Sequence, residues 1–299
     1  MAYGTIYTGA NFTINHYIET SYGTGTTGAT AVGNLGIAEK VTTFNIQNQY
    51  NPLYSLGSRE IQAYYSKGWK VSLNVEFVMC GDNKNWLNYV LQSNGVSPPT
   101  YDVGGIKSDA IQIATGEGTV YVINGIIYTD ANITVTEGDI VKVTLSGVGR
   151  AMTSYTGTIT TTIPSDLYTY KDVTASTVGN LGNGIIKDFS IDIKNSPEQY
   201  YSLGSLEYQA YLPTKFEASG SWTVYHNSSP SEMPTVLPTT ATSSADVITP
   251  FSTVYIGTDA NKYTFSVSAG VINEGEMTVE PVTVVLDKIT YIGSAVSVT

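Results

Sequence analysis

Cysteine and histidine are scarce in this chain of 299 residues. Cys80 is the only cysteine, which excludes an intramolecular disulfide and a cysteine-based metal site. We expect Cys80 to be a small buried side chain at the end of a strand. The two histidines, His16 and His226, stand far apart with no second histidine at ligand spacing. Neither predicts a catalytic or metal site, and no cofactor is expected.

Charge is also scarce, and positive charge most of all. Charged residues make up 13% of the chain, and 25 acidic residues outnumber 14 basic ones to give a net charge of −11. That balance argues against a protein that grips nucleic acid or an anionic membrane, since both need positive surface. No apolar run reaches the length of a membrane span, and the first ten residues lack the features of a secretion signal.

Motifs of known chemistry are weak here. Gly23, Gly25 and Gly28 match a phosphate-binding glycine pattern, but the mechanism needs a helix directly afterwards, and none is predicted. The Thr-Asp-Ala-Asn segments at 129–132 and 258–261 fit Asx turns, and no calcium loop surrounds them. Paired carboxylates of a glycosidase cannot be excluded from sequence, but nothing marks them. We therefore expect neither an enzyme nor a metal site.

The most informative feature is an internal repeat. Residues 54–64 and 201–211 both read Y-S-L-G-S-x-E-x-Q-A-Y, within longer related segments at 33–77 and 179–224. The distance between the copies is too long for a solenoid repeat. The sequence therefore predicts a duplicated whole domain.

Both copies carry strong β patterns. Residues 69–77 and 216–224 alternate apolar with polar side chains, as half-buried strands do. One helix is expected in the first copy, capped at Asp82 or Asn83, ending near Asn94–Gly95, and packing through Trp86, Leu87, Val90 and Leu91. Three prolines in 228–246 disfavour a helix at the matching place. The fold class is mainly β, with two tandem domains.

Composition changes suggest four segments. Residues 1–32 are expected to form an extended arm, and residues 151–176 a Thr/Ser-rich linker that can itself supply a strand. The two predicted domains cover 33–150 and 177–299.

The repeated motif is the best candidate for a functional surface. We interpret its Tyr-rich, weakly charged segments as loops. Gly57 and Gly204 are expected to form turns with a positive φ. The loops are also expected to contact other proteins, and both roles can hold together. The expected contact residues are Tyr50, Tyr54, Leu56, Gly57, Ser58, Tyr200, Tyr201, Leu203, Gly204 and Ser205. The residues that follow share a polar strand face and are expected to face solvent or a water-filled lumen, namely Glu60, Gln62, Glu207 and Gln209.

Taken in order, these features resemble tail tube proteins of tailed viruses, which are related to the tubes of contractile injection systems. Each copy has a strand, the YSLGS turn, a polar strand and a long amphipathic strand. Each copy also ends in a hairpin with an acidic Gly-containing turn, expected at 137–139 and 273–276. The resemblance covers about residues 33–150 and 177–295, and departs from the family in the missing second helix and the long N-terminal segment.

This resemblance implies two β-sandwich or half-barrel domains and a structural virion protein. Duplicated members form trimeric, pseudo-hexameric rings that stack into a hollow tube, made in the host cytoplasm, through which the genome passes without specific binding. It also implies partners among tape measure, tail terminator and distal tail or baseplate proteins. The alternatives are a surface adhesin or filament subunit with two Ig-like domains, and a carbohydrate-binding or hydrolytic β-sandwich.

Overall fold

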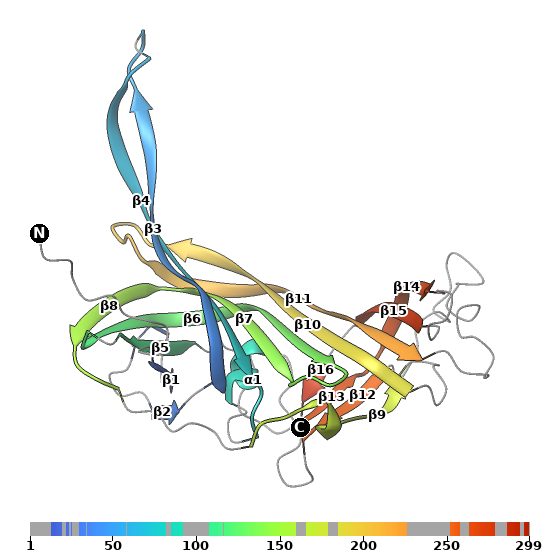
Figure 1. Ribbon diagram of the computed structural model, residues 1–299. Helices are drawn as coiled ribbons and strands as arrows, with labels where there is room; N and C mark the ends of the chain where they lie inside the picture. The colour runs from blue at the N-terminus through green and yellow to red at the C-terminus, as the bar shows by residue number, and fades with distance from the viewer. Residues whose placement is uncertain are drawn as a thin grey trace, which may run out of the picture.

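The protein is built almost entirely of antiparallel strands in a computed structural model (Figure 1). The structure describes residues 13–19, 22, 23, 25, 30–33, 35–57, 59–81, 85–91, 108–115, 117–159, 166–178, 185–225, 252–257, 263–278, 286–293 and 296–298. The expected mainly-β fold class is confirmed.

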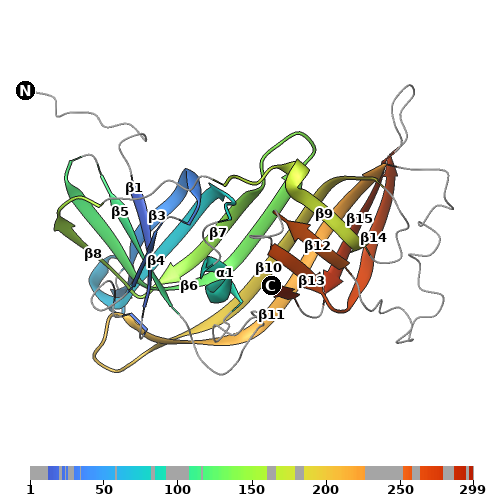
Figure 2. The same cartoon turned by 90° about the horizontal axis from the view of Figure 1, so that it is seen from below.

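A continuous run of eight strands, here called the arc, crosses the whole molecule. Its first four strands come from the first half of the chain and its last four from the second half (Figure 2). In spatial order these are β3 (Ile37–Tyr54), β4 (Ile61–Val78), β7 (Lys142–Gly149), β6 (Thr119–Thr136), β10 (Ile185–Tyr201), β11 (Tyr208–Tyr225), β15 (Leu286–Gly293) and β14 (Gly270–Thr278).

The order β3-β4-β7-β6 recurs as β10-β11-β15-β14 with the same register. In the first half, Val71–Val78 pair with Gly149–Lys142, and in the second half Ala218–Tyr225 pair with Gly293–Leu286. The β-bulge recurs too, between Tyr128 and Asp130 in β6 and between Ile272 and Glu274 in β14. Residues of the two halves can therefore be equated one by one through their partners.

The remaining strands also follow one order in both halves. In the first half β2 (Thr30–Gly33), β1 (Thr13–Ile18), β5 (Asp109–Ala114), the first part of β6 and β8 (Ala151–Thr156) lie side by side. In the second half a separate sheet holds β9 (Val173–Val178), β12 (Ser252–Ile256), β13 (Tyr263–Val267) and β16 (Val296–Val298). The single strand β6 of the first half thus corresponds to β13 and β14 of the second.

Two expected turns are strands instead. Residues 129–132 lie in the middle of β6, where the extra residue of the bulge accounts for the polar Thr-Asp-Ala-Asn run. Residues 273–276 lie inside β14, because register equates them with 129–132 rather than with the true turn at 137–139. That turn does join β6 to β7, as expected. Residues 258–261 lie outside the described residues.

The helix α1 (Asn85–Val90) forms where the apolar stripe predicts it. Trp86, Leu87, Val90 and Leu91 are all buried, and Trp86 packs edge-on against Phe77 of β4. Cys80 is buried directly after β4, as expected. The proposed cap residues of this helix lie outside the described part of the chain. A short 3-10 turn, η2 (Tyr170–Asp172), lies further along the chain and precedes β9.

The main core lies on one side of the arc. The predicted alternation holds in β4, where Val71, Leu73, Val75 and Phe77 are buried. On the core side of β11, Ala218, Trp222 and Val224 are buried. Gly220 leaves room for the Tyr291 ring, since a Cβ there would lie 2.5 Å from the Tyr291 hydroxyl oxygen.

The expected arm and linker contribute strands to both halves. Within residues 1–32, strand β1 pairs along its whole length with β5 and buries Asn15 and His16, so this part is built into the fold. Within 151–176, β8 pairs with β6 of the first half and β9 begins the four-stranded sheet of the second. Backbone pairing thus recruits polar segments that apolar patterning does not mark.

A buried polar cluster fastens β1 and β5 to β6. His16 Nε2 lies 2.6 Å from Asp109 Oδ2, and both side chains are fully buried. The Tyr128 hydroxyl donates to the same oxygen over 2.8 Å. Burial, with the Asp109 charge beside it, raises the Tyr128 pKa well above its usual value, so the hydroxyl keeps its proton. In the second half, strand register places Val178 at the position of His16 and Ile272 at the position of Tyr128. The cluster therefore belongs to the first half alone.

We predict that Asp109→Ala lowers the free energy of unfolding by about 3–5 kcal/mol, because it removes the buried carboxylate that pairs with His16 and leaves the buried Tyr128 hydroxyl without its acceptor. Denaturant unfolding followed by tryptophan fluorescence measures the loss. The matched control is Asp139→Ala, whose ion pair with Lys142 is half-exposed and should matter little. Equal effects of the two substitutions would contradict a structural role for the cluster.

Candidate assembly surfaces

The side of the arc opposite the main core is a polar surface, here called the polar face. Directly paired residues of neighbouring strands share one face, so register alone assigns its members. Its polar members are Lys40, Thr43, Asn45, Gln47, Lys70, Ser72, Asn74, Glu76, Asp130, Asn132, Thr134, Thr136, Lys142, Thr144, Ser146, Asp188, Ser190, Asp192, Lys194, Glu217, Ser219, Ser221, Thr223, Glu274, Glu276, Lys288 and Thr290. The apolar residues Ile127, Val148, Val271 and Ile292 lie on the same side.

Hydrogen bonds run across the polar face from strand to strand. The Asn74 amide donates to Ser146 Oγ over 2.9 Å, and the Ser190 and Ser221 hydroxyls lie 2.9 Å apart. At the join between the halves, the Asn132 amide donates to the Asp192 carboxylate. Small hydroxyl and amide groups dominate, with more carboxylates than ammonium groups among the described members. The face is therefore polar and weakly acidic, and several of its groups hydrogen-bond to one another.

Two hairpin tips project beyond the arc. Tip 1 joins Tyr54 to Ile61, and tip 2 joins Tyr201 to Tyr208. Gly57 and Gly204 have φ of 82° and 84°, a left-handed conformation that favours glycine, and nothing lies near the site of a Cβ. Leu56 and Leu203 beside them are fully exposed. The turn role of the two glycines is therefore confirmed, and their environment leaves the tips open for contact.

The tyrosines expected in loops lie on strands. Tyr50 and Tyr54 belong to β3, and Tyr200 and Tyr201 to β10, all with exposed side chains. The segments look like loops because each contains a proline, Pro52 or Pro197, but both prolines sit at pairing positions beside bulges, where a strand tolerates them. Ser205 caps its turn by accepting the Glu207 amide hydrogen, and Ser58 lies outside the described residues.

Tip 2 lies against the first half of the chain, next to the base of the first hairpin (Figure 1). The Trp69 amide donates to the Leu206 carbonyl over 3.2 Å, and Arg150 Nε lies 3.2 Å from the Glu207 carboxylate. Tyr208 is only 3% exposed and forms a small apolar cluster with Ile127, joined by Tyr22 and Val148. Tip 1 instead projects away from the body.

The four residues expected to face a lumen lie at or next to the tips. Glu60 and Glu207 precede their strands, and Glu207 takes part in the ion pair with Arg150. Gln62 is exposed near tip 1, and the side chain of Gln209 lies outside the described residues. Their facing a lumen stays a prediction. Sequence reasoning passed over the polar face, although the alternation in 70–76 carries its signal.

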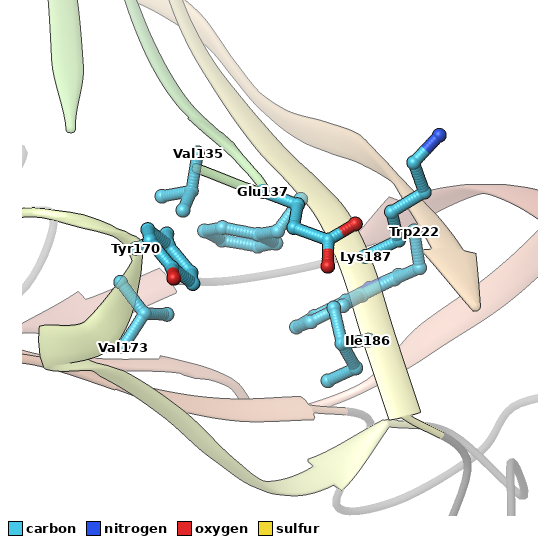
Figure 3. Close-up of a pocket in the computed structure, with 8 residues that line it drawn as sticks. Val135, Glu137, Tyr170, Val173, Ile186, Lys187 and Trp222 are labelled. Atoms are coloured by element: carbon cyan, nitrogen blue, oxygen red, sulfur yellow. The ribbon is translucent and has the colours of Figure 1, made fainter. Parts of the chain in front are cut away.

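A pocket of about 200 Å³ lies where the two halves meet. Figure 3 shows Tyr170, Val135, Val173 and Trp222 around it, and Glu137 and Lys187 also line it. This mainly apolar lining marks a seam between two packed sheets and carries no set of groups for catalysis.

Among the described residues, no group of three His, Cys, Asp or Glu side chains could hold a metal ion. No helix in the described part of the chain is long and apolar enough to span a bilayer.

Comparison with known proteins identifies a family. Residues 9–233 match the family model of phage tail tube proteins, which spans the first half and the β10–β11 hairpin of the second. No curated protein matches the chain.

We predict that Tyr208→Ala lowers the unfolding free energy of the isolated chain by about 3 kcal/mol, because it removes a buried aromatic ring from the cluster with Ile127. The matched control is Ile61→Ala at the corresponding place after tip 1, where the side chain is 42% exposed and should contribute little. Denaturant unfolding of dilute protein compares the two. If the Ile61 variant is as unstable as the Tyr208 variant, tip 1 is docked in the isolated chain.

Proposed function

This chain belongs to the phage tail tube protein family, whose members are structural components of the virion tail. From that premise we propose the detailed role of this protein. Three copies form a ring with pseudo-sixfold symmetry, and rings stack into a hollow tube. The tube conducts the viral genome during delivery. The family argues against the adhesin and hydrolase alternatives, and the role we propose requires no catalysis or cofactor.

The observation that supports the ring is the arc itself. Its two halves have the same strand order and register, and they are joined side by side as neighbours in one sheet. Repeating that join between chains would carry the sheet onward. Because each chain supplies two equivalent units, three chains supply the six units of a pseudo-hexameric ring.

Barrel geometry is consistent with a wide bore. Three arcs bring about 24 strands, and strands about 4.8 Å apart at a tilt near 40° give a backbone diameter of roughly 48 Å. After side chains are allowed for, the channel still exceeds the width of a DNA duplex. Closure also removes the open strand edges that long Val- and Thr-rich strands would otherwise expose.

The polar face suits the lining of such a channel. Its carboxylates outnumber its lysines, and its hydroxyl and amide groups carry no charge, so DNA gains little from stopping there. The opposite side of the arc is filled by the core and cannot face water. Tail tube subunits assemble with other tail proteins, and tape measure, terminator and distal tail or baseplate proteins are the partners we propose.

We predict that purified protein, concentrated and viewed by negative-stain electron microscopy, forms rings or tubes with threefold symmetry and a central channel. Native mass spectrometry should detect the trimer as the smallest closed species. Particles that remain monomeric at every concentration, or that assemble without a bore, would contradict the proposed function.

The lining can be tested separately. Thr144→Lys combined with Ser146→Lys places two positive charges per chain on the polar face, and we expect tubes of this variant to retain duplex DNA in a salt-dependent way. Co-sedimentation of labelled DNA with tubes measures retention. The control is Thr153→Lys on exposed β8, which should behave as wild type. Equal retention by both variants would place the polar face outside the channel.

A further inference from the structure

The arc ends in two open edges. Among the described strands, β3 pairs only with β4, and β14 pairs only with β15. Open edges of long strands leave backbone donors and acceptors that invite another strand. Within the chain, the corresponding edges of β6 and β10 are already joined to each other.

We propose that β14 of one chain pairs with β3 of the next in the register that joins β6 to β10 within the chain. The strand that pairs with each edge comes from a second copy of this chain, because the β6–β10 pairing within the chain is a junction of the same kind. The inference rests on the proposed tube function and deepens it by naming the interface.

Equivalence through strand partners fixes the register. Phe44 pairs with Leu73 as Ile191 pairs with Gly220, which equates Phe44 with Ile191. Ile133 pairs with Val143 as Met277 pairs with Asp287, which equates Ile133 with Met277. Since Ile191 pairs with Ile133, Phe44 is placed opposite Met277 of the neighbour. The flanking pairs are Thr43 with Thr278, Asn45 with Glu276, Ile46 with Gly275, and Gln47 with Glu274.

The residue types at these pairs match the internal junction. Asn132 and Asp192 form an amide–carboxylate pair within the chain, and Glu276 opposite Asn45 reverses the two roles while keeping the chemistry. Ala131 beside Ile193 becomes Gly275 beside Ile46, again a small residue next to isoleucine. If the pairing were shifted by one residue, the side chains of Asn45 and Glu276 would point to opposite faces of the sheet.

A second contact follows from the docking of tip 2. Tyr208 is buried on Ile127 and Val148, whose equivalents in the second half are Val271 and Ile292. These are 40% and 54% exposed, unusually open for large apolar side chains.

The equivalent of Tyr208 is Ile61, which is also exposed. The junction therefore seats Ile61 on Val271 and Ile292 of the neighbouring chain and buries all three. The Arg150–Glu207 ion pair has no counterpart there, because residue 294 is serine.

Cysteine cross-linking tests the register. In a Cys80→Ser background, chains carrying Asn45→Cys are mixed with chains carrying Glu276→Cys, assembled and mildly oxidised. Directly opposed positions meet disulfide geometry, so we expect at least about tenfold more covalent dimer than from Asn45→Cys mixed with Gly275→Cys. Asn132→Cys with Asp192→Cys in one chain is the positive control.

Ile61→Asp supplies an independent readout. It should abolish assembly while leaving the unfolding curve of the isolated chain unchanged, and Ile61→Leu should assemble normally. Rings that form without the Asn45–Glu276 cross-link, or with equal cross-linking at Gly275, would overturn the inference and leave the tube function standing. Protein that forms no rings under any condition would overturn both.

Discussion

The backbone ladder between β6 and β10 is the interaction on which this architecture depends. It joins the halves of the chain as equal neighbours in one sheet, with every residue from Asp188 to Lys194 paired. A ladder of this kind is directional and fixed in register, because a slip by one residue moves every side chain to the opposite face. It therefore sets which side of the arc is packed and which side is wet.

The sheet has one apolar face, which is buried, and one polar face. One side buries aromatic and aliphatic groups such as Trp222, Tyr291 and Phe77 against the outer strands and α1. The other carries hydroxyls and amides that hydrogen-bond across strands, for example Asn74 with Ser146. A two-layer protein of this kind fills one side of its long sheet with core and leaves the other side polar.

Local patterning predicted much of this fold and less of its surfaces. Period-two alternation identified β4 and β11, and the apolar stripe identified α1, because burial imposes those periods directly. The built-in strand β1 escaped notice, and β8 was expected only as a strand that the linker can supply, since long-range backbone pairing rather than apolar periodicity holds them. The same is true of the Asp109–His16 pair, whose members are distant in sequence and meet only in the fold.

Two halves with the same strand order within one chain are also free to diverge. An identical-subunit ring has one kind of junction, whereas a fused chain has an internal junction and an external edge that can change separately. Each change must then be matched only by its own partner, and in the junction that we propose the Asn45–Glu276 pair would exchange the amide and carboxylate of Asn132–Asp192 in this way. It also allows an asymmetric device such as the His16 cluster to stabilise one half without a copy in the other. We therefore expect the two halves to keep the same strand order while their side chains differ.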